Sequence, residues 1–409
     1  MKLLADIPAE VQWKYCAHWL LCLAVLPFPF SVALTNVLLG LALAAGIFLG
    51  NWWQGARSMW CQHRWFSLVM LSYWGLMLVG LAWSGDRAWG LHVIGRQWFW
   101  LLLPILLDCL SDERWRQRFL AALSFALALN LFYCVLQMAG MVHVTTIGSN
   151  HDDATGHIGH IGFGVVYGIW AALLLHWGWQ RTGLQRHIAW LLALWSWFMI
   201  YSAQGRSGYA VALILMLVVV YKQAGGLRRW ASVGVLVLGL GVVLALGPGK
   251  QRVQDVLLDV PKIQAGEMQQ TDVHWSLWKG ALDIWRANPA IGAGTGGFPQ
   301  AAAAVKAQRP ELVFGGAPGQ IPVHPHNMYL LALARWGVPG GVALVALLGF
   351  WAYSGWQRNW GDTPTAPMIA LPAIALSIHG LSAPSLEEHF AGIIAMLVTG
   401  AGMAGWHKG

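Results

Sequence analysis

Charged residues are scarce in this sequence. Only 10% of the 409 residues are Asp, Glu, Lys or Arg, whereas soluble domains have roughly 25%, and 57% of the residues are hydrophobic. This composition excludes an ordinary soluble domain and predicts an integral membrane protein. The excess of 25 basic over 17 acidic residues indicates contact with anionic lipid head groups. Nucleic acid is not an expected partner, because no basic run carries interleaved aromatic residues.

Cysteine is also rare. Four of the five cysteines, Cys16, Cys22, Cys109 and Cys134, fall inside apolar segments, and Cys61 lies in a short loop. No pair is placed where an oxidising compartment would join it, so disulfides are not expected. Tryptophan, in contrast, is abundant, and several of the 27 Trp lie at the ends of apolar runs, as in interfacial aromatic belts.

Long apolar runs dominate the chain. A helix needs about 17 to 25 apolar residues to cross a bilayer, and by that measure the sequence predicts about twelve spans. The expected spans begin near Tyr15, Ser31, Phe66, Gln97, Phe119, Ile161, His187, Gly208, Trp230, Asn327, Thr365 and Phe390. No small-residue cleavage pattern follows the basic N-terminus, so a first span is expected there and not a removed signal. The predicted fold class is an all-α polytopic membrane protein, with spans one to nine over residues 1–247, a large loop over 248–326, and spans ten to twelve over 327–409.

Basic residues favour one side of the predicted membrane. With a cytoplasmic N-terminus, most Lys and Arg of the short loops lie on the cytoplasmic side, and an even number of spans returns the C-terminus there. The cytoplasmic loops then hold Arg57, Arg64, Arg114, Arg116, Arg118, Arg181, Arg186, Lys222, Arg228, Arg229 and Arg358. The opposite short loops hold only Arg87, Arg96 and Arg206. The large loop must then lie outside the cytoplasm.

The large outer loop is expected to contain amphipathic helices, and connections of this length are usually functional. Apolar residues recur at roughly helical spacing between Asp272 and Ala287, which predicts one such helix at the membrane surface. They are Trp275, Leu277, Trp278, Leu282 and Trp285. The helix would end at Asn288 and Pro289, before a glycine-rich stretch that continues to Phe298.

An arginine at the outer end of the seventh predicted span is the first candidate for chemistry. Arg206 lies in the run from Gln204 to Gly208, and a cation near lipid is costly unless it has a partner. An anion or a buried polar group would supply that partner. The alternative is a side chain that snorkels to the interface.

Two histidines at the outer start of the tenth span are the second candidate. His324 and His326 flank a proline and precede Asn327, so one imidazole is placed to act as a base near neutral pH. A zinc site is one alternative, but it needs three or four ligands. The other outward histidines have no spacing that completes such a site; they are His151, His157, His160, His274 and His389. An inert loop histidine is the other alternative.

Weaker candidates accompany these two motifs. The glycine-rich stretch would let a backbone approach a phosphate, but it is neither a G-x-G-x-x-G after a strand nor a Walker loop. Paired carboxylates that could hold a divalent ion are Asp152 with Asp153 and Glu387 with Glu388. Basic residues around the stretch would offer charges to an anionic partner, and they are Lys250, Arg252, Lys262, Lys279, Arg286, Lys306 and Arg309.

The order of these motifs resembles the O-antigen ligase and polymerase superfamily. The resemblance rests on the many spans, the outward run Arg206-Ser207-Gly208, the large outer loop with Asn-Pro and glycines, and the His-x-His-Asn-x-Tyr-Leu run that begins at His324. It covers residues 156–340. Within that superfamily the chain is most similar to lipopolysaccharide O-antigen ligases. This implies a GT-C-like helical fold and a metal-independent glycosyltransferase without a cofactor.

The resemblance also implies substrates and residue roles. Such enzymes transfer an O-antigen glycan from undecaprenyl diphosphate to a lipid A-core sugar, at the periplasmic face of the bacterial inner membrane. The family's essential histidine corresponds to His326 and its outward arginine to Arg206. Relatives often have a second loop arginine where this chain has His274, so Arg286 or Lys279 would replace it. The residues expected to contact the diphosphate or the glycan are Arg286, Lys279, His324, Asn327 and His274.

The residue types suit that chemistry. A sugar diphosphate has a good leaving group, so the protein must deprotonate the acceptor hydroxyl and stabilise charge on the bridging oxygen. His326 would do the first, and Arg206 with Arg286 the second, in place of a metal. One displacement would invert the anomeric centre. The alternatives are an O-antigen polymerase, a protein O-oligosaccharyltransferase, and a lipid-linked sugar transporter, which the lack of an inverted repeat disfavours.

Overall fold

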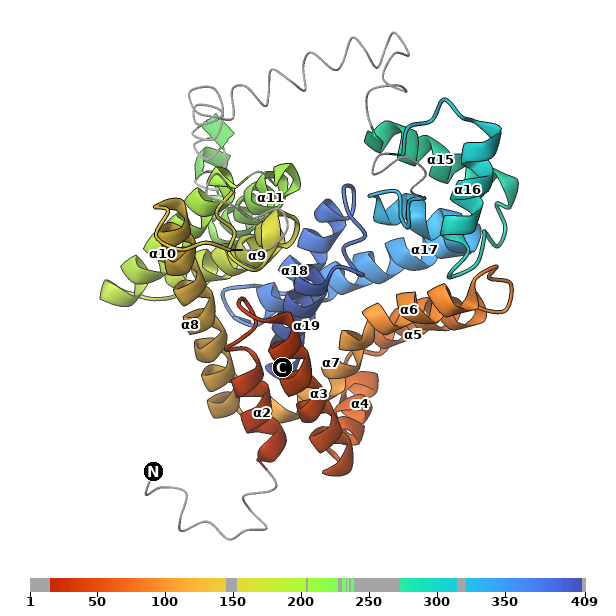
Figure 1. Cartoon of the computed structure of the whole chain (residues 1–409). Helices are drawn as coiled ribbons and strands as arrows, with labels where there is room; N and C mark the ends of the chain where they lie inside the picture. The colour runs from red at the N-terminus through yellow and green to blue at the C-terminus, as the bar shows by residue number, and fades with distance from the viewer. Residues whose placement is uncertain are drawn as a thin grey trace.

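The computed structural model of the chain is helical throughout the part that it describes (Figure 1). That part comprises residues 15–144, 153–203, 205–226, 273–314 and 321–406, with a few positions between 230 and 238. Its helices are α2 (Cys16–Ala24), α3 (Val32–Phe48), α4 (Asn51–Gln62), α5 (Arg64–Val79), α6 (Arg87–Arg96), η2 (Trp98–Leu101), α7 (Leu102–Cys109), α8 (Glu113–Met138), α9 (Gly159–Trp179), α10 (Gly183–Ser202), α11 (Arg206–Gln223), α15 (Val273–Ala287), α16 (Phe298–Gln308), α17 (Met328–Trp356), α18 (Ala366–His379) and α19 (His389–Ala404).

The helices support a membrane protein but not yet a count of twelve spans. Among the described residues, α8, α9 and α17 are long and apolar enough to cross a membrane, and the number rises to five if two bent pairs each count as one span. Shorter apolar helices of 10–17 residues lie in α5, α11, α18 and α19. The span expected from Trp230 falls largely outside the described residues. The all-α class is therefore confirmed, and the number of spans stays a prediction.

Two pairs of successive helices meet at sharp bends. α3 and α4 meet at 84°, and Gly50 between them has φ 87°, a left-handed conformation that glycine adopts readily. Beyond the bend, α4 packs on α7, where the Asn51 side chain donates a hydrogen bond to Asp108 at 2.6 Å. The second bent pair, α6 with the η2 and α7 segment, has an angle of 48°. Residues around Arg57, which were expected in a loop, therefore form a helix.

α19 lies at the centre of the bundle, in contact with α7, α9 and α18 (Figure 1). Every residue from Phe390 to Ala404 is buried, as expected for a helix that is apolar on all sides. Large apolar side chains on peripheral helices are instead exposed, including Phe48 (89%) and Leu184 (74%). Their exposure fits helices whose outer faces contact lipid.

The predicted amphipathic helix in the large loop is present as α15. Its buried residues include Leu277, and the buried Ala281 and Ile284 belong to a small separate core with residues of α16 and α17. The helix therefore buries this face against protein, whereas Trp275 remains 38% exposed. α15 and α16 lie together beside α17 (Figure 1). The loop helices are thus attached to the helix that follows the histidine motif.

α17 changes direction where the glycine-rich stretch meets it. Gly337 has φ 64°, and a Cβ there would lie 2.5 Å from the carbonyl carbon of Ala290. The amide of Val338, freed by the break, donates to the carbonyl of Pro289 at 2.9 Å. The break thus lets two backbones approach closely without leaving this amide unpaired.

Candidate active site

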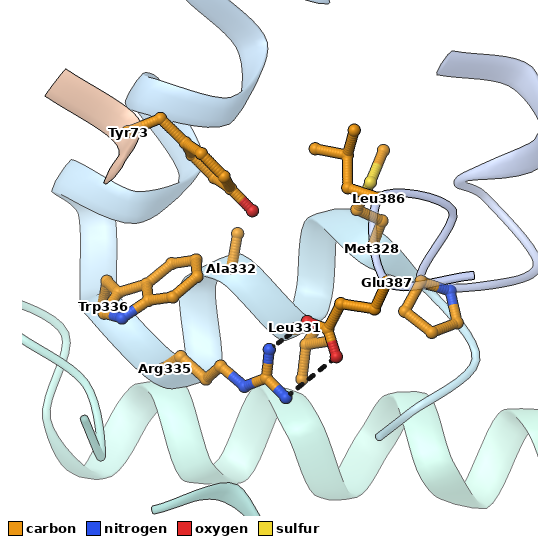
Figure 2. Close-up of a pocket in the computed structure, with 9 residues that line it drawn as sticks. Tyr73, Met328, Leu331, Ala332, Arg335, Trp336, Leu386 and Glu387 are labelled. Atoms are coloured by element: carbon orange, nitrogen blue, oxygen red, sulfur yellow. Dashed lines mark hydrogen bonds and ion pairs between the residues drawn. The ribbon is translucent and has the colours of Figure 1, made fainter. Parts of the chain in front are cut away.

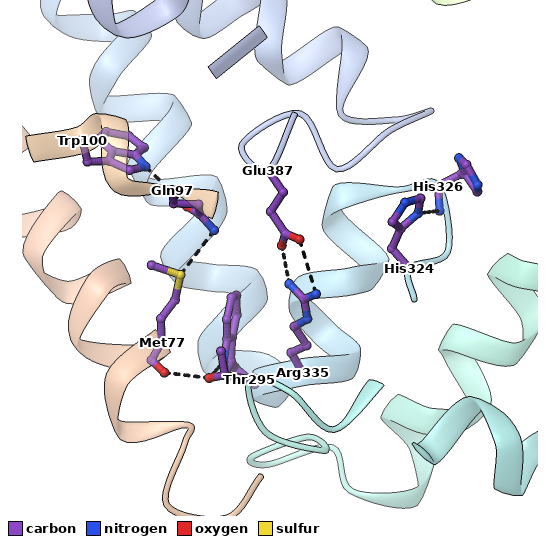
Figure 3. Close-up of polar contacts among 9 residues, drawn as sticks. Met77, Gln97, Trp100, Thr295, His324, His326, Arg335 and Glu387 are labelled. Carbon is purple, nitrogen blue, oxygen red and sulfur yellow. Dashed lines mark hydrogen bonds and ion pairs between the residues drawn. The ribbon is translucent and has the colours of Figure 1, made fainter. Parts of the chain in front are cut away.

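His326 lies immediately before α17, in a conformation that few residues other than glycine adopt. Its φ is 52°, the only positive value found among the described non-glycine residues. Its backbone N–H donates to Nδ1 of His324 at 3.3 Å, and the two imidazole centres are 4.4 Å apart (Figure 3). Such a conformation costs on the order of 1–3 kcal/mol and persists only where surrounding contacts hold it. Strained residues of this kind cluster at functional sites.

A third imidazole reaches the same place from the large loop. His274 is at the start of α15, and its ring centre lies 5.5 Å from that of His326 at an interplanar angle of 64°. The sequence placed these residues about 50 positions apart, and the fold brings them together. His274, His324 and His326 are therefore neighbours in space. No group of three His, Cys, Asp or Glu within the described residues is arranged to hold a metal ion.

The surroundings favour the neutral form of both motif histidines. Burial, followed by positive charge on His326, Arg335 and Arg96, lowers the pKa of His324 to about 3. Burial, followed by the charge of His274, lowers the pKa of His326 below its usual 6.5. His326 is only partly buried, so a substrate can reach it. A neutral, accessible imidazole is able to accept a proton near neutral pH.

Asn327 caps α17. Its side-chain oxygen accepts hydrogen bonds from the amides of Tyr329 at 3.0 Å and Leu330 at 2.9 Å. Its side-chain nitrogen donates to the carbonyl of Leu381 at 3.1 Å. This is the N-cap position, where Asn is strongly favoured. The amide thus has a structural role, and its contact with substrate stays a prediction.

A buried ion pair was missed in the sequence. Arg335, in the third turn of α17, is 1% exposed and pairs with Glu387, which is 6% exposed, through two hydrogen bonds (Figure 3). Glu387 lies in the loop 380–388 that leads from α18 to α19. A charged residue inside an apolar span was the available signal for Arg335, because such residues are usually paired and functional.

The two paired-carboxylate candidates are arranged differently. Glu387 is bound to Arg335, so it is not available beside Glu388 for a divalent ion. Burial raises the pKa of Glu388, against the opposing charge of Arg96. Asp153 lies 3.4 Å from Nδ1 of His160, and Asp152 falls outside the described residues.

The glycine-rich stretch offers few amides to a phosphate. The amides of Ala293 and Gly294 donate to carbonyls of α17 at 2.9 and 2.7 Å, and that of Gly296 donates to Oγ of Ser84 at 2.9 Å. A Cβ on Gly294 would lie 2.6 Å from Cα of Ser84. These glycines therefore permit the packing of one loop between α17 and the α5–α6 connection, and their amides are engaged there.

Arg206 is the first residue of α11, and its side chain is outside what the structure describes. The neighbouring glycines pack closely on α9: a Cβ on Gly205 would lie 2.6 Å from the carbonyl oxygen of His160, and one on Gly208 would lie 2.8 Å from Cα of Gly164. The start of α9 in turn meets the start of α19, where a Cβ on Gly162 would lie 3.0 Å from Phe390. The backbone at Arg206 is thus linked by packing to the end of loop 380–388.

The two basic candidates on α15 lie at different distances from His274. A helix rises about 1.5 Å per residue, which places Lys279 roughly 7 Å and Arg286 roughly 18 Å along the axis from His274. Arg286 is 65% exposed and lies 3.5 Å from Asp283, which is also 3.4 Å from Arg309. The structure therefore brings His274 to the histidine motif but not Arg286.

These features define the class of the protein: an all-α membrane protein with three imidazoles and a buried ion pair around the start of one long apolar helix. A family model described as O-antigen ligase (Wzy_C) matches residues 191–345. The match runs from α10 into α17 and includes Arg206, His274 and His326. Residues 191–345 are thus similar to the O-antigen ligase family. A comparison with curated proteins gave no match.

Proposed function

We propose that the protein is a lipopolysaccharide O-antigen ligase, which transfers O-antigen glycan from undecaprenyl diphosphate to a sugar hydroxyl of the lipid A core. The observation that carries the proposal is the accessible His326, whose pKa is lowered by burial, in a constrained conformation within the matched family region. Both substrates have lipid tails, so a site at the end of apolar helices suits them. The proposed location is the periplasmic side of the bacterial inner membrane, in a GT-C-like fold of about twelve spans.

In the proposed reaction, His326 removes the proton from the acceptor hydroxyl. The hydroxyl oxygen then attacks the anomeric carbon of the donor sugar, and the bond between that carbon and the diphosphate oxygen breaks. The proton remains on His326, and undecaprenyl diphosphate leaves with the bonding electron pair. Attack from the face opposite the leaving group inverts the anomeric centre.

Arg206 binds the diphosphate in this proposal. Its guanidinium would form charge-assisted hydrogen bonds as negative charge grows on the leaving oxygen, so the reaction needs no metal. Lys279 is the nearer of the two α15 cations to His274, and we propose it as a second contact ahead of Arg286. His324 and His274 lie beside His326, and positive charge on His274 lowers the pKa of His326.

Complementation of a ligase-deficient bacterium tests the proposal. Lipopolysaccharide from cells that carry the wild type should show an O-antigen ladder on a gel, and His326→Ala and Arg206→Ala should lose the ladder and accumulate lipid-linked glycan. His187→Ala is the matched control, because this exposed histidine of α10 bonds only to the carbonyl of Gly183 at 2.8 Å among the described contacts. Immunoblots of membranes check the amount of each protein.

The same experiment identifies the acceptor of the glycan. Core-sized lipopolysaccharide from cells with the wild-type protein would contradict the ligase proposal. Longer glycan chains on the lipid carrier would then identify a polymerase, and glycan on protein would identify an oligosaccharyltransferase. Retention of the anomeric configuration in the product would overturn the single displacement.

A further inference from the structure

Loop 380–388 is bound to the first turns of α17 by hydrogen bonds and an ion pair. The amide of Met328 donates to the carbonyl of Gly380 at 2.7 Å, and Asn327 donates to the carbonyl of Leu381 at 3.1 Å. Farther along, the Arg335–Glu387 ion pair joins the other end of the loop to the same helix. The loop thus lies along one face of α17, beginning beside His326.

The ion pair holds the far end of this loop. Arg335 lies seven positions after Met328, which is about two helical turns, so both lie on one face of α17. Figure 2 shows this face, with Leu331 and Ala332 between them and Glu387 reaching down from the loop to the guanidinium. The loop contributes Pro384, Leu386 and Glu387 to the same small cavity. The pair therefore fixes where the loop runs.

Stability alone does not account for this pair. Desolvation of two charges offsets much of their attraction, so a buried ion pair is often no more stable than apolar residues of similar volume. Here Nε of Arg335 has no hydrogen-bond partner, which weakens the case for stabilisation further. The pair does provide two directional hydrogen bonds from the Arg335 guanidinium to Glu387, while the carbonyl of Arg335 separately accepts from the amide of Gly294 at 2.7 Å.

We propose that Arg335 and Glu387 are positioning residues, which hold loop 380–388 against α17 and thereby keep His326 in its constrained conformation. Glu387 fixes the loop, the carbonyls of Gly380 and Leu381 hold Met328 and Asn327, and these residues fix the backbone next to His326. The proposal rests on the role of His326 as the base, and it assigns no contact with substrate to either member of the pair.

Replacement of the pair by apolar residues separates positioning from stability. Arg335→Met or Glu387→Leu alone leaves a buried charge unpaired and should lower the amount of folded protein. The double variant R335M/E387L has no such charge and should regain wild-type thermal stability in detergent. Its kcat should nevertheless stay about 10- to 100-fold below wild type with KM little changed, because small displacements of a reacting group have effects of this size. The control is R116M/E113L, which removes the partly exposed Arg116–Glu113 pair at the start of α8, far from His326 in the sequence.

Hydrogen–deuterium exchange gives a result that does not depend on activity. The amides of Met328, Tyr329 and Leu330 bond to the loop or to Asn327, so they should exchange faster in R335M/E387L than in the wild type or the α8 control. Wild-type kcat together with wild-type exchange in a stable R335M/E387L protein would overturn the positioning role. If the wild-type protein transfers no glycan, the proposed function fails. The exchange rates of these amides would still show whether the ion pair holds loop 380–388 against α17.

Discussion

The histidine motif and the glycine-rich stretch were both candidate sites in the sequence, and the structure places them in different surroundings. His326 is partly buried, and its ring approaches only other imidazoles among the contacts found. In the glycine-rich stretch, the amides of Ala293, Gly294 and Gly296 all donate to protein acceptors. Chemistry therefore requires polar groups that the fold leaves available, and residue type alone does not reveal which groups those are.

The largest expected effect comes from filling the space of a packed glycine. Gly296→Val would place a side chain into the carbonyl oxygen of Asp86 and the backbone of Gly90, so the loop could not dock. We expect loss of folded protein from the membrane, since overpacking and backbone displacement each cost about 1–3 kcal/mol or more. Gly349→Ala on α17 is the control, because no atom lies within 4 Å of the added Cβ. Detergent thermal-shift assays would measure both, and a stable Gly296→Val protein would contradict the packing role.

Loss of the Asn327 cap should have the next largest effect on stability. Asn327→Ala removes two hydrogen bonds to the first α17 amides and the bond to Leu381, at a cost of roughly 1–2 kcal/mol. Asn327→Asp keeps the acceptor for the helix but loses the donor to Leu381. We expect the melting temperature to fall more for Ala than for Asp. Equal melting temperatures for Ala and the wild type would show that the cap is unimportant.

Replacement of His274 should have a moderate effect on the pH dependence of kcat. Burial and the charge of His274 lower the pKa of His326, so the neutral base persists below pH 6.5 and is lost as the pH falls through the lowered pKa. His274→Gln removes one of these causes, and the pKa of His326 should rise. The acid limb of kcat should therefore move to higher pH. A limb that stays in place, or moves to lower pH, would exclude the electrostatic coupling.

The smallest expected effect is a difference in KM between variants of the two basic residues of α15. Lys279 lies roughly 11 Å closer to His274 along the helix than Arg286 does, by the rise per residue. Lys279→Ala should therefore raise KM for the lipid-linked donor more than Arg286→Ala does. Steady-state kinetics would measure KM for both variants. The reverse order would indicate that the diphosphate binds near Arg286 and not near Lys279.

Local patterns were sufficient for some elements but not for their arrangement. Apolar periodicity predicted α15, and the position of Asn327 before an apolar run agrees with the start of α17. The helix after Gly50 was missed because residues 51–62 include Arg57 and several polar residues, and they were therefore assigned to a cytoplasmic loop. The left-handed Gly50 lies at the end of the preceding apolar helix, which ends at Phe48.

The ion pair was missed for a different reason. Arg335 and Glu387 are separated by 52 residues and meet only when loop 380–388 lies along α17. The approach of His274 to His326 is likewise a tertiary contact between α15 and the residue before α17. The motif before the tenth span identified His326 as a candidate, and the family resemblance identified His274. Only the packing of α15 on α17 shows that the two are neighbours.

The most direct test of the role of His326 is the rate of glycan transfer by purified protein in lipid nanodiscs. Wild type, His326→Ala and the control His187→Ala would be compared with a lipid-linked glycan donor and a lipid A-core acceptor, over about pH 5 to 8. We expect His326→Ala to lower kcat by roughly 10²–10⁴-fold across this range, with His187→Ala unchanged. A folded His326→Ala protein that transfers glycan at the wild-type rate would contradict the assignment of His326 as the base.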